Sequence, residues 1–213
     1  MRRILTFVVS YFIMTQVVYG GPKETAFWGW FSKNDSRLYS FEKDQENIFN
    51  EISSELSKID PDLTFEFGPI GSDGKREFVI SGGGIKSAFP QVESLYSSAP
   101  QLPKWKYTKF RQRRSPLNDI SYGGVDVKVS DVYFNLYKDK GDRIGIIVFM
   151  KGYTKDQEDI YANIGFLILD EALGEYDVES KLGFIEFHAI NSPYFTNSKN
   201  IGELANSIDQ IFK

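Results

Sequence analysis

The chain has 213 residues, 41% of them hydrophobic and 15% aromatic, with a formal net charge of −4. This length suits one domain with a sizeable core. The mild acidity gives no bulk attraction to nucleic acid, so we expect no nucleic-acid partner. The chain contains no cysteine, which excludes thiol catalysis, cysteine-ligated zinc and iron–sulfur clusters.

The first twenty residues have the layout of a secretory signal peptide. Arg2 and Arg3 form a charged start, residues 4–14 are almost wholly apolar, and Val18 and Gly20 end the segment before Gly21. We therefore expect an exported protein, periplasmic or secreted, that is not an integral membrane protein once residues 1–20 are removed. An uncleaved anchor is the alternative, although the apolar run is short for a membrane span.

The first half of the mature chain predicts a mixture of helices and strands. The aromatic run AFWGWF at 26–31 is expected to pack onto the domain. In chain order, the apolar spacing then predicts a helix over 35–59, strands over 63–67 and 76–81, a helix over 88–96 and a strand over 105–111. A polar loop follows at 112–119.

The second half predicts more strands and the strongest helix. In chain order these are strands over 125–129, 132–137 and 144–150, a helix over 154–173 that stops at Gly174, a strand over 182–188 and a helix over 201–211. Residues 144–150 have no polar face, as expected of a central strand. We therefore predict a single α+β domain over 24–213, with a mostly antiparallel sheet and helices packed on one face.

Four segments carry a resemblance to a known group of proteins. They read AFWGWFSKN, DLTFEFGPI, REFVISGGGI and GFLILDEALGEYDVESKLGFIEF. Across residues 27–188 the chain resembles a family of uncharacterised bacterial proteins. The resemblance implies one bacterial domain and brings no activity, ligand or catalytic residue with it.

Five carboxylates lie within the eleven residues LDEALGEYDVE at 169–179. They are Asp170, Glu171, Glu175, Asp177 and Glu179. The preferred interpretation is a solvated helix end whose carboxylates diverge, with no bound metal. The alternative is a calcium or catalytic site, since alternate carboxylates of an extended tail share one side. Acidic residues at a helix C-terminus oppose the macrodipole, so we expect a compensating cation, either Lys181 or the basic segment 104–114.

This basic segment interleaves six cations with aromatic residues in a protein that is acidic overall. Its candidate binding residues are Lys104, Trp105, Lys106, Lys109, Arg111, Arg113 and Arg114. Outside the cytoplasm such a surface favours an anionic lipid, an acidic glycan or an acidic partner. The preferred interpretation is a lysine-protected edge strand, which prevents unwanted sheet pairing.

Two further features carry weaker signals. Gly82, Gly83 and Gly84 lie between a predicted strand and a predicted helix, where backbone N–H groups can cradle an anion, but a tight turn is the simpler interpretation. His188 is the only histidine, and no GxSxG or HExxH motif occurs. We interpret His188 as structural.

The sequence thus favours a non-enzymatic binding or interaction module with no cofactor and no catalytic residue. The expected partner is another envelope or secreted protein, or an anionic surface. The alternative is a carboxylate-dependent hydrolase that acts on an envelope glycan through the 170–179 segment. A third possibility is a subunit of an envelope assembly, which exposure of Trp28 and Trp30 would favour.

Overall fold

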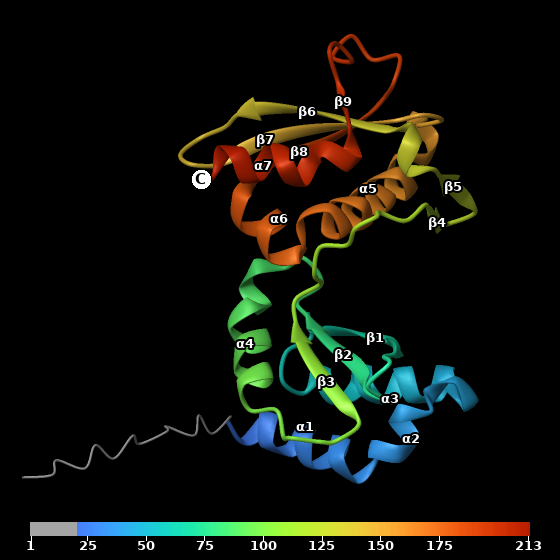
Figure 1. Ribbon diagram of the computed structural model, residues 1–213, viewed down its shortest axis with the longest axis vertical. Helices are drawn as coiled ribbons and strands as arrows, with labels where there is room; N and C mark the ends of the chain where they lie inside the picture. Colours follow the sequence, from blue (N-terminus) through green and yellow to red (C-terminus); the bar gives the residue numbers. More distant parts are fainter. Residues whose placement is uncertain (1–20) are drawn as a thin grey trace, which may run out of the picture.

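The structure, a computed structural model, describes residues 21–213 and divides them into two lobes (Figure 1). The signal peptide expected at 1–20 lies outside the described residues. Each lobe has its own cluster of buried apolar side chains. The chain passes between the lobes through the polar segment that follows β3 (Trp105–Lys109).

The N-terminal lobe contains four helices and a three-stranded sheet. The helices are α1 (Pro22–Lys33), α2 (Asp35–Tyr39), α3 (Gln45–Ser57) and α4 (Phe89–Ser97). The strands are β1 (Thr64–Ile70), β2 (Arg76–Ser81) and β3, in the order β1-β2-β3. β1 is antiparallel to β2, and β3 is parallel to it.

Alternation along β2 decides which face of this sheet the helices cover. Phe78 and Ile80 are fully buried in the lobe core together with Phe31 of α1 and Ile52 of α3. Glu77 points to the opposite face, where its neighbours are Lys106 and Thr108 of β3. One face of the sheet is therefore apolar and covered by helices, while the other is polar and open.

The C-terminal lobe contains the remaining strands and helices. The strands are β4 (Ile120–Tyr122), β5 (Val125–Val127), β6 (Val132–Lys138), β7 (Ile144–Met150), β8 (Leu182–Ala189) and β9 (Lys199–Asn200). The helices are α5 (Glu158–Leu173), α6 (Glu175–Lys181) and α7 (Leu204–Ile211). β4 and β5 form a hairpin, and the main sheet has the order β8-β7-β6-β9.

The prediction of an α+β fold with mostly antiparallel strands is confirmed. Only two of the strand pairs in the described residues, β2–β3 and β7–β8, are parallel. The strands form three sheets. Ile146 and Val148 are fully buried in β7, as its apolar sequence predicts, and pack in one cluster with Ile164 and Ile168 of α5. The assignment of 24–213 to a single domain stays a prediction.

Two local predictions are wrong. The helix expected over 35–59 is divided, because a turn at residues 40–44 separates α2 from α3. The guanidinium of Arg76 fixes this turn, since it lies 4.6 Å from the ring centre of Phe41 and 2.5 Å from a carboxylate oxygen of Glu42. The tail after Gly174 is the helix α6, not an extended segment.

The aromatic run at 26–31 belongs to α1 and packs onto the lobe core, as expected. Trp28 is only 4% exposed and its indole N–H donates to the carbonyl of Leu95. Trp30 packs partly buried against the same cluster. The exposure of these tryptophans that would favour an envelope assembly is therefore not observed. Within residues 21–213 no helix combines the length and apolar character needed to cross a membrane.

Candidate functional site

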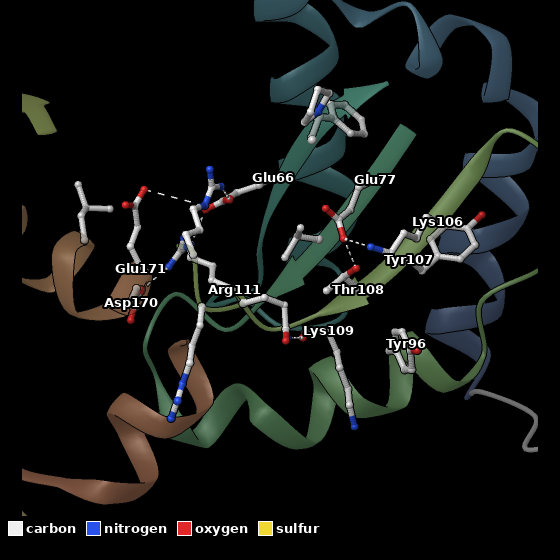
Figure 2. Close-up of a pocket in the computed structure, with 18 of the residues that line it drawn as sticks. Glu66, Glu77, Tyr96, Lys106, Tyr107, Thr108, Lys109, Arg111, Asp170 and Glu171 are labelled. Atoms are coloured by element: carbon white, nitrogen blue, oxygen red, sulfur yellow. Dashed lines mark hydrogen bonds and ion pairs between the residues drawn. The ribbon is translucent and has the colours of Figure 1, made fainter. Parts of the chain in front are cut away.

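A groove of about 730 Å3 lies between the lobes. Its floor is the open polar face of the N-terminal sheet, and its far wall is the C-terminal end of α5 (Figure 2). Charged residues from both lobes line it, and they are Glu66, Glu77, Lys106, Lys109, Arg111, Arg113, Arg114, Asp170 and Glu171. We call this feature the interlobe groove.

The basic segment predicted from the sequence forms one side of the interlobe groove. Five of its six cations line the groove, and each forms an ion pair. The partners are Glu77 for Lys106, Glu93 for Lys109, Glu66 and Asp170 for Arg111, Asp177 and Asp209 for Arg113, and Glu66 and Glu171 for Arg114. The other two candidates lie elsewhere, since Trp105 is buried and Lys104 lies over the ring of Tyr39.

Glu175 joins the two lobes directly. Its side chain is fully buried. One carboxylate oxygen accepts hydrogen bonds from the N–H groups of Gly82 at 2.8 Å and Gly84 at 3.2 Å. The other accepts from the N–H of Arg111 at 3.1 Å, and the N–H of Glu175 donates to the Arg111 carbonyl at 3.0 Å. We call this set the Glu175 clasp. The glycine turn therefore does cradle an anion, and that anion is a side chain of the same chain.

Arg111 also connects the lobes through its side chain. Its Nε lies 2.6 Å from Glu66 of β1, and one terminal nitrogen lies 3.2 Å from Asp170 of α5. Burial raises the pKa of Asp170 to about 6, against the opposing effect of Arg111. The nearby charges of Glu175 and Glu179 raise it further. At Asp170 the effect of burial on the pKa thus outweighs that of its cationic neighbour.

The remaining carboxylates of 170–179 lie in different surroundings. Glu171 accepts hydrogen bonds from the backbone and side-chain amides of Asn118. Asp177 pairs with Arg113 at 2.5 Å and with Lys181 at 3.0 Å. Burial raises the pKa of Glu179. Both cations proposed as compensation for the acidic helix end therefore take part.

The interpretation of these carboxylates as a solvated helix end is wrong for Asp170 and Glu175, which are buried. Asp170 is only 8% exposed and Glu175 is fully buried. The reason is that Gly174, at a φ of 80°, turns the chain so that α6 begins at once and carries Glu175 into the junction. In the described part of the chain, no three acidic or histidine side chains are placed to hold a metal ion.

Aromatic packing supports the same junction. The rings of Phe89 in α4 and Phe110 after β3 lie 4.6 Å apart between centroids. Both contact Tyr176 of α6, at 5.7 Å and 5.4 Å. This apolar contact thus joins the lobes together with the Glu175 clasp, the ion pairs of Arg111 and the looser ion pairs of Arg114.

His188 lies on the outer face of the C-terminal lobe. Its Nε2 is 3.0 Å from Glu186, and its Nδ1 is 3.4 Å from the hydroxyl of Ser192. That hydroxyl also accepts a weak hydrogen bond from the N–H of Tyr194. These contacts fasten the turn after β8 to the strand, which agrees with a structural histidine.

Sequence reasoning missed the residues that form the floor of the interlobe groove. Glu66, Glu77 and Thr108 come from three strands, and the Thr108 hydroxyl donates to Glu77. Thr108 and Lys106 lower the pKa of Glu77 against the effect of its burial. Alternation within β1 and β2 could have placed these carboxylates opposite the core, but not beside the basic segment.

Comparison with known proteins found no relative of this chain. No family model matches the chain, and neither a curated protein nor a solved structure matches it. The resemblance to uncharacterised bacterial proteins therefore stays a prediction.

Proposed function

We propose that this protein is an exported, non-enzymatic binding module and that the interlobe groove is its main binding surface. One observation carries the proposal. The basic segment and the end of α5, about sixty residues apart in the chain, line the same cavity of about 730 Å3. Ligand sites in proteins typically measure about 300–1,000 Å3 and lie where domains or lobes meet.

Two cations of the groove remain available to a partner. The side chains of Lys106 and Arg114 are 65% and 57% exposed. Arg114 is only loosely paired, with its nitrogens 3.7 Å from Glu66 and 3.9 Å from Glu171. A guanidinium in this state can form charge-assisted hydrogen bonds with a carboxylate or phosphate. The partner we propose is another envelope or secreted protein, or an anionic surface, that contacts these two residues.

Charge reversal in the groove tests this function. The double variant Lys106→Glu/Arg114→Glu should lose a species that the purified wild-type protein captures from the envelope fraction of its host, or lose flotation with anionic lipid vesicles. Lys151→Glu is the matched control, because Lys151 is 63% exposed and lies outside the groove. Equal loss in both variants, or loss in neither, would show that the groove is not the binding surface.

A carboxylate-dependent hydrolase is the second candidate, and Asp170 is the observation that favours it. Its pKa of about 6 is near the range in which a carboxylic acid can donate a proton to a leaving group. Asp170 and Glu66 flank the guanidinium of Arg111 in the groove. Release of reducing ends from envelope glycan by wild type, abolished in Asp170→Asn and retained in Asp209→Asn, would establish this activity and overturn the non-enzymatic proposal.

A further inference from the structure

The outer edge of β6 is only partly paired. β9 pairs with it at Tyr133 and Phe134, while β7 pairs along its other side over the full strand. On the outer side, residues 135–138 have no strand partner within the described chain. Unpaired N–H and C=O groups at such an edge can pair with an added strand. We call residues 135–138 the open lane of β6.

The chain before β9 contacts the open lane at Asn135. Asn197 has a positive φ of 54°, which turns the backbone just before β9 begins. The side-chain amide of Asn135 donates to the carbonyls of Tyr194 and Thr196 and fixes this loop at one end of the lane. Figure 1 shows the loop projecting from the sheet beside β9. The loop therefore contacts the lane at Asn135 but adds no strand beside residues 136–138.

Two cavities lie along the open lane. One, of about 390 Å3, lies between residues 134–137 of β6, residues 196, 197 and 199, and Ser207 of α7. The other, of about 700 Å3, is lined by residues 136–138, 141–144 and the end of α7 at Ile211 and Phe212. Leu136 and Tyr137 belong to both. Together they form a groove between a sheet edge and a helix.

We propose that the open lane binds an extended peptide segment of a partner protein by strand addition. In this mode the backbone hydrogen bonds supply affinity, and pockets for alternate side chains supply specificity. The peptide would lie on the same side of β6 as β9 and would pair with residues 135–138. An apolar side chain of the peptide would enter the cavity formed by Leu136, Ile144, Ile211 and Phe212.

The placement of these apolar residues follows from strand alternation. Val132 and Phe134 of β6 face the core, so Leu136 faces the same side and packs at the edge of that core. Ile211 and Phe212 are 49% and 37% exposed at the end of α7. Every second side chain of an added strand would point toward this exposed apolar site.

The charges around the open lane favour an acidic peptide. Its two cavities are lined by Lys138, Arg143 and Lys199 against a single carboxylate, Asp142. Lys138 and Lys199 form no ion pair within residues 21–213. The expected ligand therefore combines an apolar residue with a flanking Asp, Glu or C-terminal carboxylate. The site lies on the C-terminal lobe and does not depend on the interlobe groove.

Selection of a random peptide library displayed on phage against the purified protein tests this site. We expect enriched peptides that contain an apolar residue beside an acidic one. When such a peptide is synthesised and added, the backbone amide signals of residues 135–138 should shift and become protected from hydrogen exchange. Phe212→Asp should weaken its binding by roughly tenfold or more, and Lys138→Glu should also weaken it.

Two control variants test whether the peptide binds at the open lane and at no other surface. Phe166→Asp should bind the peptide as wild type does, because Phe166 is 44% exposed but lies on α5. Lys106→Glu/Arg114→Glu should also bind normally, which distinguishes this site from the interlobe groove. The proposal is overturned if no peptide is enriched, or if binding leaves residues 135–138 unchanged. If raising the protein concentration alone protects those amides, the lane binds a second copy of this chain. That result would also overturn the proposal.

Discussion

Glu175 and Arg111 bond each other twice across the junction of the lobes, through one side-chain and one backbone acceptor at 3.1 Å and 3.0 Å. The same carboxylate also holds the turn at Gly82. A fully buried carboxylate is stable only when its charge is met by donors of this kind. The clasp therefore fixes the backbone of Arg111, which lines the interlobe groove, against α6.

The first prediction concerns this clasp. Glu175→Ala leaves one buried and two part-buried N–H groups without this acceptor. It should lower the free energy of unfolding by about 3–5 kcal/mol. Glu175→Gln retains one acceptor oxygen and should cost less. Denaturant unfolding measures both. Glu46→Ala, at an exposed site on α3, should change stability by under about 0.5 kcal/mol. An equally small effect of Glu175→Ala would show that the clasp contributes little.

The second prediction concerns pH. The pKa of Asp170 is raised to about 6 from an ordinary value of 3.8, so the folded state favours its protonated form. This contribution to stability is fully present below about pH 4 and is lost as the pH rises through 6. Between pH 4 and 7, the free energy of unfolding of wild type should therefore fall by roughly 2–3 kcal/mol relative to that of Asp170→Asn.

Asp209 provides a control of opposite sign for the pH experiment. Arg113 lowers the pKa of this carboxyl, so its contribution is present above its ordinary pKa and is lost as the pH falls. As the pH falls, the free energy of unfolding of wild type should therefore decrease relative to that of Asp209→Asn. Urea unfolding at a series of pH values measures both differences. The same sign for both pairs would contradict the assignment of Asp170.

The third prediction concerns the core of the C-terminal lobe. Ile146 is fully buried in β7, and truncation of a buried isoleucine to alanine typically costs about 2–5 kcal/mol. Ile70→Ala is the matched control, since Ile70 is 48% exposed at the end of β1. Denaturant unfolding should separate the two variants clearly. Similar losses would mean that β7 is not the centre of its lobe.

The fourth prediction uses two helical glycines. A Cβ on Gly165 of α5 would lie 2.0 Å from the ring of Phe187, so Gly165→Ala should cost about 1–3 kcal/mol through overpacking. A Cβ on Gly29 of α1 meets nothing within 4 Å, so Gly29→Ala should stabilise by roughly 0.5–1 kcal/mol. Thermal melts compare them. Phe187→Leu should relieve part of the Gly165→Ala penalty, and a gain from both alanines would refute the contact.

The fifth prediction concerns export. Because Arg2 to Gly20 has the order of a signal peptide, protein from the native host should begin near Gly21. Intact mass of the periplasmic and culture fractions measures this. A full-length species confined to the cytoplasm would contradict export.

Much of the fold follows from local sequence patterns, while the site depends on contacts between distant segments. The apolar run of β7 and the helical spacing of α5 are properties of neighbouring residues, so both were predictable. Sequence also indicated that the acidic end of α5 needs a compensating cation. It did not reveal that Glu175 is buried, because that depends on where Gly174 directs α6 and on the glycine turn more than ninety residues earlier in the chain.

The single passage of the chain between the lobes has a consequence for how this sequence can evolve. Each core is encoded by one continuous half of the gene, so substitutions inside one core need no answering change in the other. Substitutions in one lobe should require compensating substitutions in the other chiefly at the junction. There, loss of the carboxylate at 175 would remove the reason for glycine at 84, whose φ of 76° other residues rarely adopt. If the clasp constrains evolution in this way, residues 84 and 175 should be replaced together in related sequences.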